Sequence, residues 1–321
     1  GELEVLVPAG VYPTGGASVY LSINRSVHVR AVGGDAVIDC GGIGSGLDLV
    51  LSSGLDVVLS GVTFLNCTSW GYPNGHATSI SSRPEEEMRL WGVGPAPGWC
   101  EYCWCSMQFC AKGGAVTISS PTVEQEVVDA NVTFSNCTFD GNWADKGAAV
   151  ALGLFTNVTD SVFLFEDCRF LNNKALLRGG PAIDVMLDYA YSTPYYRNTG
   201  TWHTSVLKHS EIAVSGCHFE GNVGNSEGAI AIWSKAGLLH GSDISVRNSA
   251  FVRNFGGNGG AIAWEVGSTQ GEEMNTLWLE GTRFEDNAAR DAVGGAVSAT
   301  LPMARMYPDP PLPNQFRNFA H

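Results

Sequence analysis

The stretch that decides the fold reads Val132-Thr133-Phe134-Ser135-Asn136-Cys137-Thr138-Phe139-Asp140-Gly141-Asn142 and is followed shortly by Gly147-Ala148-Ala149-Val150. Its second half recurs four times further along the chain, as a small residue, any residue and Phe, with Asn three positions later. The phenylalanines are at 139, 170, 219, 251 and 284, so the steps are 31, 49, 32 and 33 residues. A period of roughly 20–50 residues indicates a solenoid, in which each unit packs on its neighbours.

Each repeat is predicted to be a coil of short β-strands. The segments around the phenylalanines are rich in Val, Ile, Phe and Thr, and Gly, Asn and Asp interrupt them. No window inside a repeat has the apolar spacing of an amphipathic helix. The long step of 49 residues indicates an insertion in one coil.

Two adjacent columns of the repeat predict a tight bend. An earlier copy, Val62–Thr68, matches Val132–Thr138 at six of seven positions, and this alignment adds Asn66 and Cys67 to the columns. The first column contains only types that tolerate left-handed backbone: Asn66, Asn136, Asp167, Gly216, Asn248 and Gly281. The second column is small and is expected to face inward together with the Phe: Cys67, Cys137, Cys168, Cys217, Ser249 and Thr282.

Two more columns predict two more corners. The asparagines at 142, 173, 222, 254 and 287 are expected at a second turn, where their amides could bond from coil to coil. A Gly-Gly-Ala column predicts a third corner that admits only small residues. We therefore predict an all-β, right-handed parallel β-helix. The alternative, an antiparallel sandwich with accidental repeats, is disfavoured by six copies of one pattern.

The motif Phe-x-x-Asn followed by Gly-Gly-Ala-Ile/Val resembles the repeat of the chlamydial polymorphic outer-membrane proteins, and more broadly the pectin-lyase-like β-helix superfamily. The resemblance is clearest over residues 131–299. It implies a surface protein or adhesin, because most proteins with this repeat have such roles. The sequence departs from this family in lacking a recognisable membrane-barrel segment.

The predicted organisation is one β-helix over residues 1–303 with two loop insertions. The first insertion, about 69–112, is rich in Cys and Trp, and the second, 184–210, is rich in aromatic residues. Residues 304–321 contain four prolines and are expected to be an extended tail or linker. Open solenoid ends expose unpaired backbone, so the tail, further sequence or a partner is expected to cover them.

Composition and sequons favour an extracellular or cell-surface protein made in the secretory pathway. The formal net charge of −14 disfavours nucleic acid as a partner, and no apolar run is long enough for a transmembrane helix. The chain begins with Gly1, so we expect a piece of a longer protein. Five sequons favour glycosylation. We predict modification at Asn24, Asn131 and Asn157, and place Asn66 and Asn136 second because their bend column is expected to face inward.

Seven of the nine cysteines fall into two groups with different expected chemistry. Four lie within the first insertion, at Cys100, Cys103, Cys105 and Cys110. This spacing could bind zinc, but an oxidising compartment favours disulfides. The stacked thiols Cys137, Cys168 and Cys217 are within disulfide range of one another across coils, and we expect them to remain thiols that fill the core.

The predicted function is a non-enzymatic structural or adhesive module of a larger extracellular assembly that binds protein subunits or glycan. The candidate contacts are aromatic residues of the insertions: Trp91, Trp99, Trp104, Tyr191, Tyr195, Tyr196 and Trp202. The alternative is a polysaccharide lyase or glycoside hydrolase, which needs paired carboxylates, or a calcium-binding acidic cluster with a base. The outer-row residues Asp140, Glu220 and Glu285 form no convincing catalytic set. We expect no cofactor; calcium is compatible with the fold class but no motif indicates it.

Overall fold

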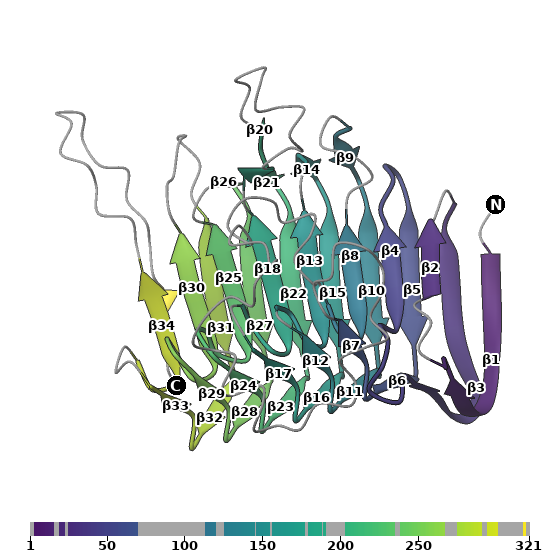
Figure 1. Ribbon diagram of the computed structural model, residues 1–321. Coiled ribbons are helices and arrows are strands. Elements are labelled where there is room, and N and C mark those ends of the chain that lie inside the picture. The colour runs from purple at the N-terminus through teal and green to yellow at the C-terminus, as the bar shows by residue number, and fades with distance from the viewer. Residues whose placement is uncertain are drawn as a thin grey trace, which may run out of the picture.

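The computed structural model describes residues 3–15, 19–22, 25–69, 113–119, 125–144, 146–154, 156–176, 179–187, 189–190, 203–234, 238–266, 275–290, 294–300 and 317–318. In these residues the chain winds through stacked coils, and equivalent strands of successive coils lie side by side from the N-terminal to the C-terminal end (Figure 1). Every strand pair in the four larger sheets is parallel, for example β10 with β15 and β13 with β18. The predicted all-β parallel β-helix is confirmed.

The largest sheet has 15 strands and consists of two wings that share the long strand β3 (Val27–Asp39). Strand β1 (Leu3–Pro13) pairs along β3. The first wing continues with β5 (Asp56–Ser60), β10 (Asn131–Ser135), β15 (Val162–Glu166), β22 (Glu211–Ser215), β27 (Asp243–Arg247), β31 (Thr276–Glu280) and β35 (Arg317–Asn318). The second wing continues with β6 (Val62–Leu65), β11 (Thr138–Asp140), β16 (Arg169–Leu171), β23 (His218–Glu220), β28 (Ala250–Val252) and β32 (Arg283–Glu285).

Three further parallel sheets complete the coils. The six-stranded sheet contains β7 (Thr68–Ser69), β12 (Trp143–Ala144), β17 (Lys174–Ala175), β24 (Val223–Gly224), β29 (Phe255–Gly256) and β33 (Ala288–Ala289). The eight-stranded sheet contains β2 (Val19–Ser22), β4 (Leu47–Val50), β8 (Val116–Ser119), β13 (Val150–Leu154), β18 (Ile183–Leu187), β25 (Ile230–Ser234), β30 (Ile262–Val266) and β34 (Val297–Thr300). The four-stranded sheet contains β9 (Val127–Val128), β14 (Val158–Thr159), β21 (Val206–Lys208) and β26 (Leu238–His240).

The phenylalanine column forms a continuous stack through the core. Adjacent rings are nearly parallel, with centroid distances of 5.4, 4.9, 4.7, 4.4 and 5.2 Å along Phe64, Phe139, Phe170, Phe219, Phe251 and Phe284. A second stack, Phe134 on Phe165, lies in the first wing. Strand alternation produces this arrangement, because every second side chain of each wing points inward.

The predicted left-handed bend between the two wings is confirmed. Asn136, Asp167 and Asn248 have φ values of 51°, 51° and 48°, and Gly216 and Gly281 occupy the same column with φ values of 65° and 57°. Only a short polar side chain or glycine adopts this conformation at low cost. Each of these five coils therefore turns from one wing to the next at a residue that the sequence alone identifies.

The predicted alignment of the earlier copy is wrong by five residues. Phe64 pairs with Phe139, and Leu59 is the residue that pairs with Phe134. Gly61, with a φ of 69°, therefore occupies the bend between the wings. The similarity misled because each coil contains two consecutive strands with the same alternation of inward and outward side chains.

The asparagine column forms the coil-to-coil ladder that its spacing predicts. Four successive amide-to-amide hydrogen bonds, each of 2.9 Å from Nδ2 to Oδ1, join Asn142, Asn173, Asn222, Asn254 and Asn287. Each Nδ2 also donates to the carbonyl oxygen of a Phe in the preceding coil, as Asn173 does to Phe139 at 3.0 Å. The first four side chains are at most 1% exposed, so every buried amide is paired.

A second polar ladder was not predicted. Backbone N–H groups donate across the coils to side-chain oxygens of the next coil, from Ala130 to Ser161, from Ser161 to Ser210, from Ser210 to Ser242 and from Ser242 to Asn275. These residues precede each strand of the first wing. Serine is common in the sequence, so this column does not stand out without the register.

The structure separates the cysteines into one disulfide and three buried thiols among the described residues. Cys40 and Cys67 form a disulfide with a Cα–Cα distance of 4.7 Å, a pairing the sequence did not indicate. Cys137, Cys168 and Cys217 are free and buried, as predicted. The neighbouring thiols of Cys137 and Cys217, together with burial, raise the pKa of Cys168 well above its usual range.

Two predicted boundaries need correction. Within the predicted insertion at 184–210, strands β18 and β21 belong to regular sheets, and among the described residues the antiparallel hairpin of β19 (Tyr189–Ala190) and β20 (His203–Thr204) departs from the coil. In the predicted tail, β35 pairs with β31 and extends the first wing. No helix long and apolar enough to cross a membrane occurs in the part of the chain that the structure describes.

Candidate functional site on the outer face of the eight-stranded sheet

The outer face of the eight-stranded sheet contains the most unusual polar side chain of the described structure. In β18, Ile183 and Val185 face the main core, so Asp184 between them points to the outer face. Asp184 is nevertheless 0% exposed. A buried carboxyl group needs hydrogen bonds or a partner charge, so the groups around Asp184 determine its charge state and its reactivity.

Asp184 and Glu227 together hold the turn Gly179-Gly180. The N–H of Gly180 donates to Oδ1 of Asp184 at 3.2 Å, and the N–H of Gly179 donates to Oε2 of Glu227 at 2.6 Å. Gly179 has a φ of +86°, and a Cβ placed there would lie 2.2 Å from Oδ2 of Asp184. Only glycine fits this position, because the carboxyl group occupies the space of a side chain.

The electrostatics of Asp184 favour its uncharged form. Burial, and then the charge of Glu227, raise the pKa of Asp184 to about 8, while the Gly180 N–H and the Lys146 ammonium act in the opposite direction. Oδ2 of Asp184 has no hydrogen-bond partner in the described structure. Glu227 is 7% exposed and Lys146 is 8% exposed, so all three groups are largely removed from water.

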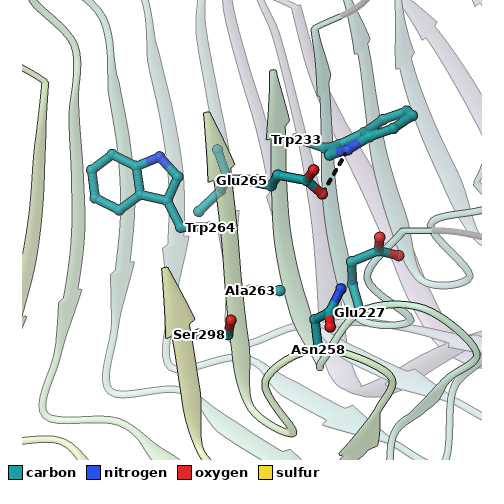
Figure 2. A pocket seen from close by; sticks show the side chains of 8 residues that line it. Glu227, Trp233, Asn258, Ala263, Trp264, Glu265 and Ser298 are labelled. Carbon is teal, nitrogen blue, oxygen red and sulfur yellow. Dashed lines mark hydrogen bonds between the residues drawn. The ribbon is translucent and has the colours of Figure 1, made fainter. Parts of the chain in front are cut away.

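A small recess lies next to this cluster on the same sheet (Figure 2). Its polar lining includes Glu227, Asn258, Glu265 and Ser298. The indole Nε1 of Trp233 donates to Oε2 of Glu265 at 3.1 Å, and both side chains lie on one side of the sheet, opposite to Trp264. Trp233 is only 8% exposed, so its ring is not an open stacking platform.

The charged side chains of the second wing form neighbouring ion pairs at the surface. Glu220 lies between His218, at 2.9 Å, and Arg253. The hydrogen bond from His218 lowers the pKa of Glu220, and the charge of Arg253 acts in the same direction. Arg283 and Glu285 form a further exposed pair at 3.2 Å. These two carboxylates interact with cations of their own wing.

The described sequons are placed differently from the prediction. Asn66 and Asn136 are exposed, so the premise that their bend column faces inward is wrong. The cause is the left-handed bend, which turns the side chain outward. Asn131 is half-buried and its Nδ2 donates to Asp56 at 2.9 Å, whereas Asn157 is exposed. Asn24 lies outside the described residues, and glycosylation stays a prediction.

The other predicted site residues also lie outside the described residues, and their roles stay predictions. They are the disulfide candidates Cys100, Cys103, Cys105 and Cys110, and the contact candidates Trp91, Trp99, Trp104, Tyr191, Tyr195, Tyr196 and Trp202. The structure therefore brings together residues that sequence reasoning missed. Asp184, Glu227 and Lys146 share no motif, and only the register of three coils places them side by side.

Within the described ranges, no group of three or more His, Cys, Asp or Glu side chains could hold a metal ion. The acidic cluster described above contains two carboxyl groups and a lysine, which is not a calcium donor set. The described site therefore offers no fit for the calcium that many β-helix lyases use.

Comparison with known proteins adds one solved structure. No protein-family model and no curated protein sequence matches the chain. The chain is similar to the catalytic domain of a GH87 alpha-1,3-glucanase in complex with nigerose, at 11% identity over 92% of this chain and 61% of that chain, with a TM-score of 0.18. A TM-score this low supports no argument about fold or function, so the site has to be judged on its own geometry.

Proposed function

We propose that this chain is a non-enzymatic structural or adhesive module of an extracellular assembly. The proposal rests on one observation: two buried carboxyl groups bond to the backbone of a turn. The acidic pair Asp184 and Glu227 is buried and bonded to the backbone of the turn Gly179-Gly180. A polysaccharide could reach such a pair only if the turn moved away.

The core supports a stiff module. The asparagine ladder and the phenylalanine stack run through the same coils, so each coil is tied to the next by paired amides and by ring packing. In a solenoid, stability is the sum of such nearest-neighbour interfaces. A rod of this kind suits a spacer or a scaffold that presents its loops to a partner.

An extracellular location fits the same picture. The disulfide Cys40–Cys67 is a feature that oxidising compartments preserve. The resemblance of the repeat to chlamydial polymorphic outer-membrane proteins and to pectin-lyase-like proteins supports a surface role for the chain. Secretion predicts N-linked glycans, and the exposed Asn66, Asn136 and Asn157 become the sequons to examine first.

An activity screen tests the non-enzymatic part of the proposal. The purified glycoprotein is incubated with acidic and neutral polysaccharides, with calcium and with a chelator, and new reducing ends and unsaturated sugars are followed. We expect no turnover while circular dichroism shows the β fold. Turnover that disappears with chelator would instead establish a lyase.

Loop substitutions test the adhesive part. We expect the aromatic residues of the second insertion to contact protein or glycan, so changing Tyr191, Tyr195 and Tyr196 to Ser should reduce binding to immobilised matrix proteins and polysaccharides at least several-fold. Phe255→Ser is the matched control, because Phe255 is a 36% exposed aromatic residue on the coil surface. Equal loss in both variants would remove the loop from the proposed contact surface.

A glycoside hydrolase remains the second candidate, and one observation favours it. Hydrolases use one carboxyl group that stays protonated and a second carboxylate, and burial and the charge of Glu227 raise the pKa of Asp184 to about 8, so Asp184 could be the protonated group. If the screen detects hydrolysis, Asp184→Asn and Glu227→Gln should each abolish it. Retained hydrolysis in both variants would exclude this pair as its source.

A further inference from the structure

Three side chains with complementary chemistry come from three successive coils. Strands β13, β18 and β25 are neighbours in the eight-stranded sheet. Lys146 lies just before β13, Asp184 lies within β18, and Glu227 lies just before β25. An amine, a carboxyl group and a second carboxylate are thus gathered at one buried place, with exposures of 8%, 0% and 7%.

The backbone around these residues places the amine within reach of the carboxyl group. A Cβ built on Gly147 would lie 3.1 Å from the Cβ of Asp184, and Lys146 is the residue directly before Gly147. The ammonium of Lys146 interacts electrostatically with the Asp184 carboxyl group, so the two groups are already near each other. The flexible four-carbon stem of lysine allows Nζ to approach Cγ of Asp184 further. Lys146 forms no ion pair with either carboxyl group in the described structure, so its side chain must rotate to make this contact.

Glu227 is bonded to the same turn as Asp184. Two consecutive N–H groups of one turn bond to the two acids, that of Gly179 to Glu227 and that of Gly180 to Asp184. Oδ2 of Asp184, on a fully buried side chain, has no hydrogen-bond partner among the described residues. Such an unpaired buried oxygen costs stability unless it has a use.

We propose that Lys146 and Asp184 form an isopeptide bond between adjacent coils, with Glu227 as the proton carrier. The ammonium of Lys146 first gives a proton to the Glu227 carboxylate. The neutral Nζ then attacks Cγ of the uncharged Asp184 carboxyl group, the Nζ–Cγ bond forms and the Cγ–Oδ2 bond breaks. The leaving hydroxyl takes the second proton from Nζ and departs as water, and Glu227 releases its proton to solvent.

The surroundings favour each step of this condensation. The raised pKa of Asp184 keeps its carboxyl group uncharged at neutral pH, which makes it an acceptor for an amine. Exclusion of water opposes hydrolysis of the product. No oxidant or cofactor is needed, because the reaction only removes water. The bond would tie two coils covalently. It is compatible with the adhesive proposal and excludes Asp184 as the acid of a hydrolase, because the amide has no carboxyl group left.

Peptide mapping of the folded, purified protein tests the proposal. Tryptic digestion and tandem mass spectrometry should detect one branched peptide that joins Lys146 to Asp184, lacks cleavage at Lys146 and is lighter by one water than its two parts. Detection of both residues unmodified in all of the folded protein would overturn the proposal, and so would a cross-link that joins either residue to another position.

Two variants test the roles, and one serves as the control. Lys146→Arg should remove the branched peptide, whereas Lys174→Arg, which changes a half-buried lysine elsewhere, should retain it. Glu227→Gln should reduce its yield at least tenfold in protein that circular dichroism shows to be folded. A wild-type yield in folded Glu227→Gln would refute the assignment of Glu227 as the proton carrier.

Discussion

The asparagine ladder and the Lys146–Asp184–Glu227 cluster are both polar, buried and built by stacking coils, yet they differ in how their atoms are satisfied. In the ladder, each of Asn173 and Asn222 donates to the next amide and to a Phe carbonyl oxygen. In the cluster, Oδ2 of Asp184 has no partner within the described residues, and Asp184 stands beside a second acid. The ladder repeats in five coils, whereas the cluster occurs once within the described residues.

This difference separates polar groups that hold the fold from polar groups that are available for chemistry. A repeated column whose polar groups are all hydrogen-bonded stabilises every coil and leaves no polar group free to react. A single cluster with an unpaired oxygen is a cost that a solenoid does not require, since the equivalent positions of neighbouring strands are Ala151 and Ala231. Four predictions test this distinction, in decreasing order of effect.

Breaking the ladder in its middle should have the largest effect. Asn173→Ala removes the acceptor of the Asn142 backbone N–H and side chain, and the donor to Phe139 and Asn222. We expect the free energy of unfolding to fall by about 4 kcal/mol, since several buried groups lose their partners. Urea denaturation followed by circular dichroism measures this loss.

The matched control is Asn287→Ala at the end of the same ladder. Asn287 is half-buried, so water can replace its bonds and we expect a loss of about 1 kcal/mol. Equal losses at the two positions would mean that burial does not determine how much the hydrogen bonds of the ladder stabilise the fold. The contrast between the ladder and the cluster would then not hold.

The ladder and the bends show how much of the fold can be predicted from sequence. Asn142, Asn173 and Asn222 repeat at the step of the phenylalanines, so periodicity alone gives their column and their role. The register of the first coil could not be obtained in this way. Val62–Leu65 resembles both wing strands of a later coil, and only pairing of Phe64 with Phe139 decides between them.

Titration of Asp184 should have the second largest effect. The variant Lys146→Arg excludes the proposed cross-link and leaves the carboxyl group free to ionise. The pKa of Asp184 is about 8 in the folded protein and about 3.9 in an unfolded chain, so the folded state binds more protons between these values. Stability should be fully present below about pH 4 and should be lost as pH rises through 8.

The double variant Lys146→Arg/Asp184→Asn isolates this carboxyl group. Its amide does not ionise, so its free energy of unfolding, measured in urea from pH 5 to pH 9, should lack that part of the decline. The same pH dependence in both variants would show that Asp184 is ionised throughout. The cluster would then resemble the ladder in having no group that is available for a reaction.

Sequence reasoning could not find this cluster, for a physical reason. Lys146, Asp184 and Glu227 each belong to a different coil, and they occupy different positions within their coils. Single lysines and acids are common on solvated faces, so none of the three attracts notice alone. The only sequence signal is Asp184 within the apolar run Ala182-Ile183-Asp184-Val185-Met186-Leu187, where an acid is out of place.

Filling the turn of the cluster should have a moderate effect. In Gly179→Ala, the new Cβ would lie 2.2 Å from Oδ2 of Asp184, and the backbone has a φ of +86°. We expect a loss of about 2 kcal/mol from steric conflict and strain. Gly141→Ala is the matched change beside the ladder, with a φ of +64° and its nearest contact at 3.0 Å, and should cost about 1 kcal/mol. A larger loss at Gly141 in urea denaturation would contradict the crowding that we describe at Asp184.

Removing an exposed charge should have the smallest effect. Arg283 and Glu285 form an ion pair at 3.2 Å, and their side chains are 66% and 48% exposed. Glu285→Gln should change the free energy of unfolding by less than about 0.5 kcal/mol, because water screens the pair and replaces its bonds. A loss above about 1 kcal/mol would mean that polar groups on the surface of the second wing stabilise the coils as buried ones do. The contrast between ladder and cluster depends on burial, so that result would require both to be reinterpreted.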